Sequence, residues 1–103
     1  MSENQIRVNY TRGGRRLNRR SFTLNEARQT TLGQVMGREH LTEGLETGFE
    51  VYVCCRQDGR ELSAHGQDEN TLESVLQAAT NDGEVSGKEF EIDCTAVHVG
   101  AGA

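Results

Sequence analysis

Cysteine and histidine are the residue types in this sequence best suited to hold a metal ion or to act as a nucleophile. Structural zinc sites take these residues in closely spaced pairs, and neither Cys-x-x-Cys nor His-x₃-His occurs here. Alternation along FEVYVCC and KEFEIDC places Cys55 and Cys94 in the core, where a free thiol behaves as a small apolar group, and turns Cys54 outward. The sequence therefore predicts no metal site among Cys54, Cys55, Cys94, His40, His65 and His98.

Catalytic motifs and membrane signals are equally sparse. No Ser-His-Asp set, phosphate-binding loop or pair of carboxylates stands out, so we expect a protein that is not an enzyme and needs no cofactor. Adjacent cysteines pair only through a strained ring, which argues against a disulfide framework. The N-terminal residues lack a leader pattern, and no apolar run reaches the roughly 20 residues that cross a bilayer. These features favour a cytoplasmic protein that has no membrane segment.

The stretch NDGEVSGKEFEI is similar to the second half of an EF-hand calcium loop. Asp82, Gly83 and Glu89 fall at its fifth, sixth and twelfth positions. The first and third positions hold Ala78 and Thr80, so two carboxylate ligands are missing. We expect a turn that ends a helix here, with a degenerate calcium sensor as a third alternative that a calcium-dependent thermal shift would reveal.

Charge is distributed unevenly along the 103 residues, whose formal net charge is −5. Residues 1–38 contain eight arginines and two glutamates, a net charge of +6, whereas residues 39–103 contain three basic and fourteen acidic residues, a net charge of −11. Five arginines of the first predicted hairpin either form a solvated loop, dock an acidic protein or bind phosphates. Nucleic acid is the least favoured partner, because few aromatic residues lie nearby and the rest of the chain repels a polyanion. The candidate partner-binding residues are Arg12, Arg15, Arg16, Arg19 and Arg20.

The hydrophobic pattern predicts one α+β domain with a mixed sheet of five strands. Alternating apolar residues indicate strands at 6–10, 20–24, 49–55, 61–65 and 88–99. Thr31 and Gln34 form a capping box at the start of one helix, and Asn70 is expected to cap a second. The expected order is therefore β-β-α-β-β-α-β.

Pairing register constrains the first hairpin. Ile6 and Val8 share a face with Phe22 and Leu24 only if directly paired positions sum to an even number. A two-residue Gly-Gly turn gives an odd sum, so we expect a longer loop or a β-bulge.

A short segment recurs in the chain. TLGQV at 31–35 returns as TLESV at 71–75, each at the start of a predicted helix. An old duplication explains this recurrence, and so does the shared physics of two hairpin-plus-helix units.

The element order resembles that of the ubiquitin-like β-grasp family. Two stretches add local likeness: QTTLGQVM at the main helix, and DGRELSAHGQDENTLESVL, which is similar to the acidic-Gly-Arg-x-Leu-Ser stretch and the later Thr-Leu of ubiquitin. The chain departs from ubiquitin in its greater length and in the predicted helix at the second Thr-Leu. The resemblance implies a β-grasp-like domain over residues 1–99 and a flexible C-terminal tail over residues 100–103.

The resemblance also implies a role for that tail. In modifiers and sulfur carriers of this family, a separate enzyme adenylates a C-terminal glycine carboxylate inside a channel that only glycine backbones pass. Gly100, Gly102 and Ala103 are the corresponding conjugation-tail residues, although the terminus reads Gly-Ala-Gly-Ala where the family has Gly-Gly. We expect a protein modifier or carrier, for which the sole lysine, Lys88, limits self-modification. The alternatives are a frayed tail and a non-enzymatic binding module, a small inhibitor or adaptor that acts through the arginine-rich hairpin.

Overall fold

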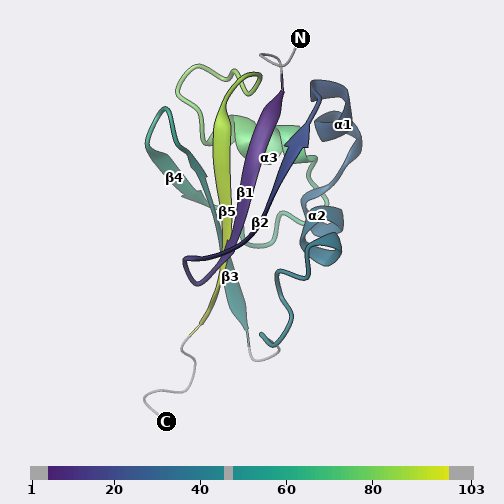
Figure 1. Ribbon diagram of the computed structural model, residues 1–103, viewed down its shortest axis with the longest axis vertical. Helices are drawn as coiled ribbons and strands as arrows, with labels where there is room; N and C mark the ends of the chain where they lie inside the picture. The colour runs from purple at the N-terminus through teal and green to yellow at the C-terminus, as the bar shows by residue number, and fades with distance from the viewer. Residues whose placement is uncertain (1–4, 46–47, 98–103) are drawn as a thin grey trace.

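The computed structural model describes residues 5–45 and 48–97. Five strands form one mixed sheet in the order β2-β1-β5-β3-β4, in which β1 and β5 run parallel and the other neighbours run antiparallel (Figure 1). The elements are β1 (Ile6–Arg12), β2 (Arg15–Phe22), α1 (Leu24–Gln29), α2 (Leu32–Arg38), β3 (Phe49–Cys55), β4 (Arg60–Ser63), α3 (Leu72–Ala78) and β5 (Glu89–Ala96). The α+β class and the five-stranded mixed sheet are confirmed, but the expected number of helices is wrong, because there are three in the described part of the chain.

The missed helix is α1. The strand predicted over 20–24 begins earlier, at Arg15, and ends at Phe22, and Leu24 begins α1. Thr23 caps α1 by accepting from the amide of Glu26 at 3.1 Å, while the Glu26 carboxylate accepts from the amide of Thr23 at 2.8 Å. This reciprocal capping box stabilises the start of a helix too short to persist alone, and it overrides the apparent alternation of RSFTL.

A β-bulge resolves the register of the first hairpin. Near the Gly-Gly turn, Arg12 pairs with Arg15. The two residue numbers sum to an odd value, as expected for a two-residue turn. The pairing register shifts by one residue between Tyr10 and Thr11. On the far side of this shift the numbers of paired residues sum to an even value, and Ile6 lies opposite Phe22. The extra residue is Leu17, a large apolar side chain that is 41% exposed. The bulge therefore turns Phe22 into the core and Leu17 outward.

Threonine residues cap the other two helices. Thr31 forms the expected capping box with Gln34 at the start of α2. The expected cap of α3 at Asn70 is wrong, because the Thr71 side chain accepts from the amide of Ser74 at 3.1 Å. The carbonyl of Asn70 instead accepts from the amide of Leu32 at the start of α2, so the backbone of Asn70 caps the neighbouring helix.

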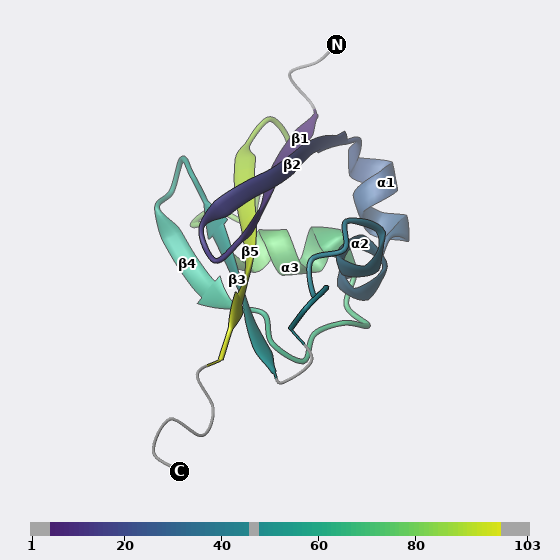
Figure 2. The ribbon, with the colours of Figure 1, turned by 60° about the horizontal axis from the view of Figure 1, so that its bottom comes forward.

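The core lies between the sheet and the three helices, which gather on one face; α3 crosses behind β1 and β5 in Figure 1, and Figure 2 shows α1 and α2 beside it. Even-numbered side chains of β1 and β5 and odd-numbered side chains of β3 point to this face, as strand alternation requires. The buried set includes Ile6, Val8, Val51, Val53, Cys55, Phe90, Ile92, Cys94, Leu32, Val35, Leu72 and Leu76. The opposite, helix-free side of the sheet is called the open face below.

Candidate functional site

The five arginines of the first hairpin do not form one patch. Strand alternation and the bulge send Arg12 and Arg20 toward the helices, where both have partners within the described residues. Arg15, Arg16 and Arg19 are exposed, and no ion pair or side-chain hydrogen bond holds them within the described part of the chain. Of these three, Arg16 and Arg19 lie on the open face, whereas Arg15 pairs with Arg12 and lies on the helix side.

Arg20 is a structural residue. Its Nε lies 2.8 Å from Oε2 of Glu39, and the other carboxylate oxygen accepts from Asn18 Nδ2 at 3.0 Å. The Glu39 side chain is only 5% exposed, so removing Arg20 would leave a buried carboxylate without its counter-charge. The pair fastens β2 to the end of α2.

Arg12 is also structural. Its guanidinium donates to the backbone carbonyls of His40 and Leu41, just past the C-terminal end of α2. Carbonyls at a helix C-terminus lack partners within the helix, and a cation there also interacts favourably with the negative end of the helix dipole. Arg12 therefore holds the end of β1 against α2, and its guanidinium is already hydrogen-bonded within the fold.

Two further arginines extend the basic surface on the open face. Arg7 lies on β1 opposite Ser21, on the same side as Arg19, and Arg56 follows β3. The pKa of Glu89 is lowered first by a hydrogen bond from Asn9 and then by the charges of Arg56, Arg19 and Arg7. Sequence analysis missed Arg7 because it lies outside the arginine-rich turn, although the alternation of IRVNY already placed it on the outer side.

A polar network holds the centre of the open face. Asn9 is 1% exposed and donates through Nδ2 to Glu89 Oε2 at 2.7 Å and to the carbonyl of Phe90 at 3.3 Å. Asp93 Oδ1 accepts from the Thr11 hydroxyl and, at 2.9 Å, from the amide of Gly14. These bonds fix the first hairpin onto β5 and give Glu89 and Asp93 structural partners.

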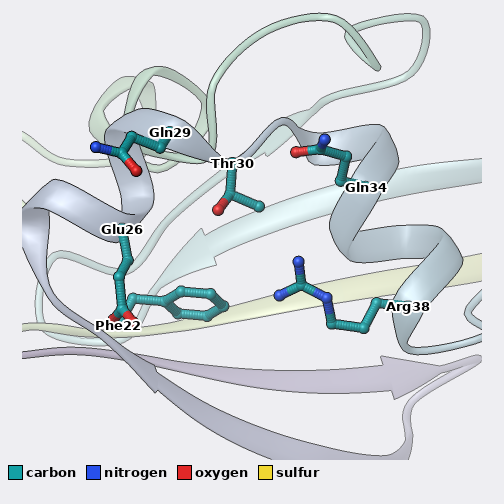
Figure 3. Close-up of a pocket in the computed structure, with 6 residues that line it drawn as sticks. All are labelled: Phe22, Glu26, Gln29, Thr30, Gln34 and Arg38. Atoms are coloured by element: carbon teal, nitrogen blue, oxygen red, sulfur yellow. The ribbon is translucent and has the colours of Figure 1, made fainter.

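A small hollow lies between β2, α1 and α2, with a cavity volume of about 340 Å³. In Figure 3 the Phe22 ring and the Arg38 guanidinium point into it. The side-chain oxygens of Glu26 and Gln34 accept from the amides of Thr23 and Thr31, so both act as helix caps. The hollow is lined by Phe22, Glu26, Gln29, Thr30, Gln34 and Arg38. No hydroxyl of this lining is hydrogen-bonded to a base among the described residues, which leaves the hollow without a catalytic pair.

The cysteines lie where alternation predicted. Cys55 and Cys94 are buried, and burial raises the pKa of the Cys94 thiol to about 11. Cys54 is half-buried on the open face, where burial and then Glu61 and Glu91 raise the pKa of its thiol. A raised pKa lowers the thiolate fraction and hence the reactivity. Within residues 5–45 and 48–97, no three His, Cys, Asp or Glu side chains gather closely enough to hold a metal ion.

Lys88 is held by two carboxylates. Its Nζ lies 2.7 Å from Asp82 Oδ1 and 3.3 Å from Asp58 Oδ2, and its side chain is 16% exposed. The hydrogen bond to Asp82 is the main cause that raises the pKa of Lys88. A lysine ammonium therefore binds the carboxylate at the fifth position of the would-be calcium loop.

The conjugation-tail residues Gly100, Gly102 and Ala103 lie outside the described residues. The last described strand, β5, ends at Ala96, where the amide of Val97 donates to the carbonyl of Gly48 at 3.2 Å. None of the helices in the described part of the chain combines the length and apolar character needed to cross a membrane.

Comparison of the chain with protein-family models, with curated proteins and with solved structures finds no match.

Proposed function

We propose that this chain is a ubiquitin-like β-grasp protein that serves as a modifier or carrier. The observation that supports the proposal is the strand order β2-β1-β5-β3-β4, with the N-terminal strand parallel to the C-terminal strand in the interior of the sheet. In this sheet β5 ends at Ala96, shortly before the tail residues in the sequence. The role given to that segment rests on the resemblance in its sequence.

The chemistry would belong to a separate enzyme. A glycine carboxylate at the end of the tail would attack the α-phosphate of ATP and release pyrophosphate. The acyl group would then pass to an enzyme cysteine with release of AMP, and onward to an amine with release of the cysteine thiol. Alternatively, sulfide supplied by a separate donor would displace AMP to give a thiocarboxylate. This route needs Gly100 or Gly102 to become the C-terminal residue, so Ala103 has to be removed. The chain itself would supply the carboxylate and the surface that its enzyme recognises.

Intact mass of the protein purified from its native host tests the proposal. A species that ends at Gly102 or Gly100, or a series of heavier adducts joined through that residue, is the expected result. A single species that retains Ala103 overturns it. A variant that lacks residues 100–103 should lose every adduct while its thermal midpoint stays unchanged, because β5 ends at Ala96.

The exposed arginines support a second candidate, a binding module that docks an acidic protein. Arg15, Arg16 and Arg19 are exposed and are not held by the fold in the described residues. Reversing these three to Glu should abolish binding of a fluorescent oligo-glutamate peptide, measured by anisotropy at low salt. Arg12 and Arg20 are left unchanged, because their reversal would damage the fold. Equal peptide binding by the wild type and the triple variant would exclude this candidate.

A further inference from the structure

The open face of the sheet has no helix of the described residues over it. All three helices pack on the other side, and in Figure 1 β1 and β5 cross in front of α3. The open face is polar: Asn9 and Thr11 on β1 are buried among longer neighbours, while Tyr52 and Cys54 on β3 are half-buried. Its charged side chains are therefore its most distinctive feature.

The charges on this face are divided between strands. The basic side lies on β2 and β1, where Arg7 faces outward opposite Ser21, Arg16 opposite Thr11 and Arg19 opposite Asn9. The acidic side lies on β5, β3 and β4 and consists of Glu50, Glu61, Glu89, Glu91 and Asp93. Within these strands the boundary runs between the parallel pair β1 and β5. Arg56, just beyond the end of β3, is the exception to this division.

This division selects one way for two sheets to stack. A two-fold axis that runs along the strands, above the boundary between β1 and β5, turns a second copy over and exchanges its two sides. The basic side of each copy then lies on the acidic side of the other, with β1 facing β5 and β2 facing β3. An axis across the strands would instead place like charges together.

We propose that the open face binds a second copy of this chain in this two-fold arrangement. The interface is self-complementary, so it closes at two copies and does not propagate into a fibre. Stacked sheets lie about 10 Å apart, a distance that arginine and glutamate side chains from opposite faces span together. Aligned stacking also keeps the strand directions of the two sheets within about 30°, so the two sides stay superimposed along the strands.

The inference rests on the docking role proposed for Arg19 and gives that surface a specific partner. It does not depend on residues 100–103. Arg7 and Arg19 on one side, and Glu61 and Glu91 on the other, are the residues to substitute, because the strand register places Arg19 and both glutamates at the same level of the sheet. Glu89, Asp93 and Glu50 are less suitable for substitution, because they accept hydrogen bonds from Asn9, from the hairpin turn and from the Tyr52 hydroxyl.

Sedimentation of the full chain under reducing conditions tests the proposal. We expect dimers at about 0.01 M salt, where the Debye length is about 30 Å, and monomers at about 1 M salt, where it is about 3 Å. An Arg7→Glu/Arg19→Glu variant leaves Arg16 as the one basic side chain that these five strands place on the open face, and a Glu61→Arg/Glu91→Arg variant gives the strands' share of this face a net positive charge. Each variant alone should be monomeric at low salt, with a dissociation constant raised at least tenfold. An equimolar mixture should form heterodimers, and this rescue shows that both variants are folded.

The matched control reverses two arginines away from the open face. Arg38 is on α2, and Arg60 lies opposite the buried Cys55, so its side chain is on the helix side. An Arg38→Glu/Arg60→Glu variant carries the same change in net charge and should dimerise like the wild type. A wild type that stays monomeric at low salt, or a mixture that gives no heterodimer, overturns the proposal. If a monomeric wild type still binds the oligo-glutamate peptide, only the self-association proposal has failed. If it neither dimerises nor binds the peptide, the proposed docking role of the arginines is excluded as well.

Discussion

Thr31 and Thr71 pair as an isolated antiparallel bridge that joins the starts of α2 and α3. The pairing is reciprocal. The amide of Leu32 donates to the carbonyl of Asn70 at 2.9 Å, and the amide of Leu72 donates to the carbonyl of Thr30 at 2.7 Å. Each threonine side chain also caps its own helix. The two recurring TL-x-x-V segments therefore meet at one pseudo-symmetric contact, which satisfies amides that a helix start leaves without partners.

Replacing either capping threonine should destabilise the fold. Thr31→Ala and Thr71→Ala are each expected to lower the free energy of unfolding by about 1 kcal/mol, because the amides of Gln34 and Ser74 lose their side-chain acceptors. Urea denaturation measures the loss. Serine keeps the hydroxyl, so Thr31→Ser and Thr71→Ser should stay close to the wild type. A serine variant as unstable as its alanine counterpart would show that the methyl group, and not the cap, matters.

Gly33 has little room for a side chain, although it lies within a helix. Its amide donates to the Asp68 carbonyl at 2.9 Å, and a Cβ at this position would lie 3.2 Å from both Cβ and O of Asp68. We expect Gly33→Ala to lower the thermal midpoint despite the better helix propensity of alanine. Gly37, in the same helix, has open space around its Cβ position, so Gly37→Ala is the control and should raise the midpoint. A rise in both variants would contradict the close approach.

Local patterns predicted four of the five strands and the capping box at Thr31, because each depends on residues close in sequence, whereas β2 begins five residues before its predicted start. They could have predicted α1 as well, since Thr23 and Glu26 form the same kind of box. The site was less predictable. Arg12 and Arg20 look like their neighbours in sequence, and their partners, the His40 carbonyl and Glu39, are brought to them only by packing of α2 against the hairpin. Sequence separation, and not residue type, hid these roles.

Deleting Leu17 should leave the fold intact. Removing this bulged residue restores a regular two-residue hairpin in which Tyr10 still pairs with Asn18 and Ile6 with Phe22. We expect the deletion variant to keep its cooperative thermal transition. Deletion of Glu91 from the regular strand β5 is the control, because it reverses the faces of part of that strand and should abolish folding. Loss of cooperative unfolding on deletion of Leu17 would show that the bulge itself is required.

Backbone strain at His40 predicts a stabilising substitution. His40 has a φ of 56°, in the left-handed region, directly after the C-cap Glu39 of α2. Glycine avoids the roughly 1–2 kcal/mol steric cost of an L-residue at this conformation, and its greater entropy in the unfolded chain offsets part of that gain, so His40→Gly should raise the free energy of unfolding by about 0.5–1 kcal/mol. The carbonyl that accepts from Arg12 is kept. His40→Val should lower the stability, since a β-branched residue is disfavoured at positive φ. Guanidinium denaturation that ranks valine above glycine would contradict this interpretation.

The buried hydroxyl of Tyr10 predicts a second stabilising change. Tyr10 is fully buried, and its hydroxyl has no hydrogen-bond partner among the described residues. Removing an unpaired buried polar group relieves its desolvation cost, so Tyr10→Phe should raise the free energy of unfolding by about 1 kcal/mol at neutral pH.

Alkaline pH should enlarge the advantage of the Tyr10→Phe variant. Burial, and then the charge of Glu39, raise the pKa of Tyr10 in the folded chain well above its ordinary value of 10.0. Above that value the unfolded chain loses a proton that the folded chain retains, so the wild type loses stability as the pH rises. The variant lacks this contribution. Urea denaturation at neutral pH and above pH 10 measures the difference between the two proteins, which should grow with pH; a constant difference would mean that the hydroxyl ionises equally in both states.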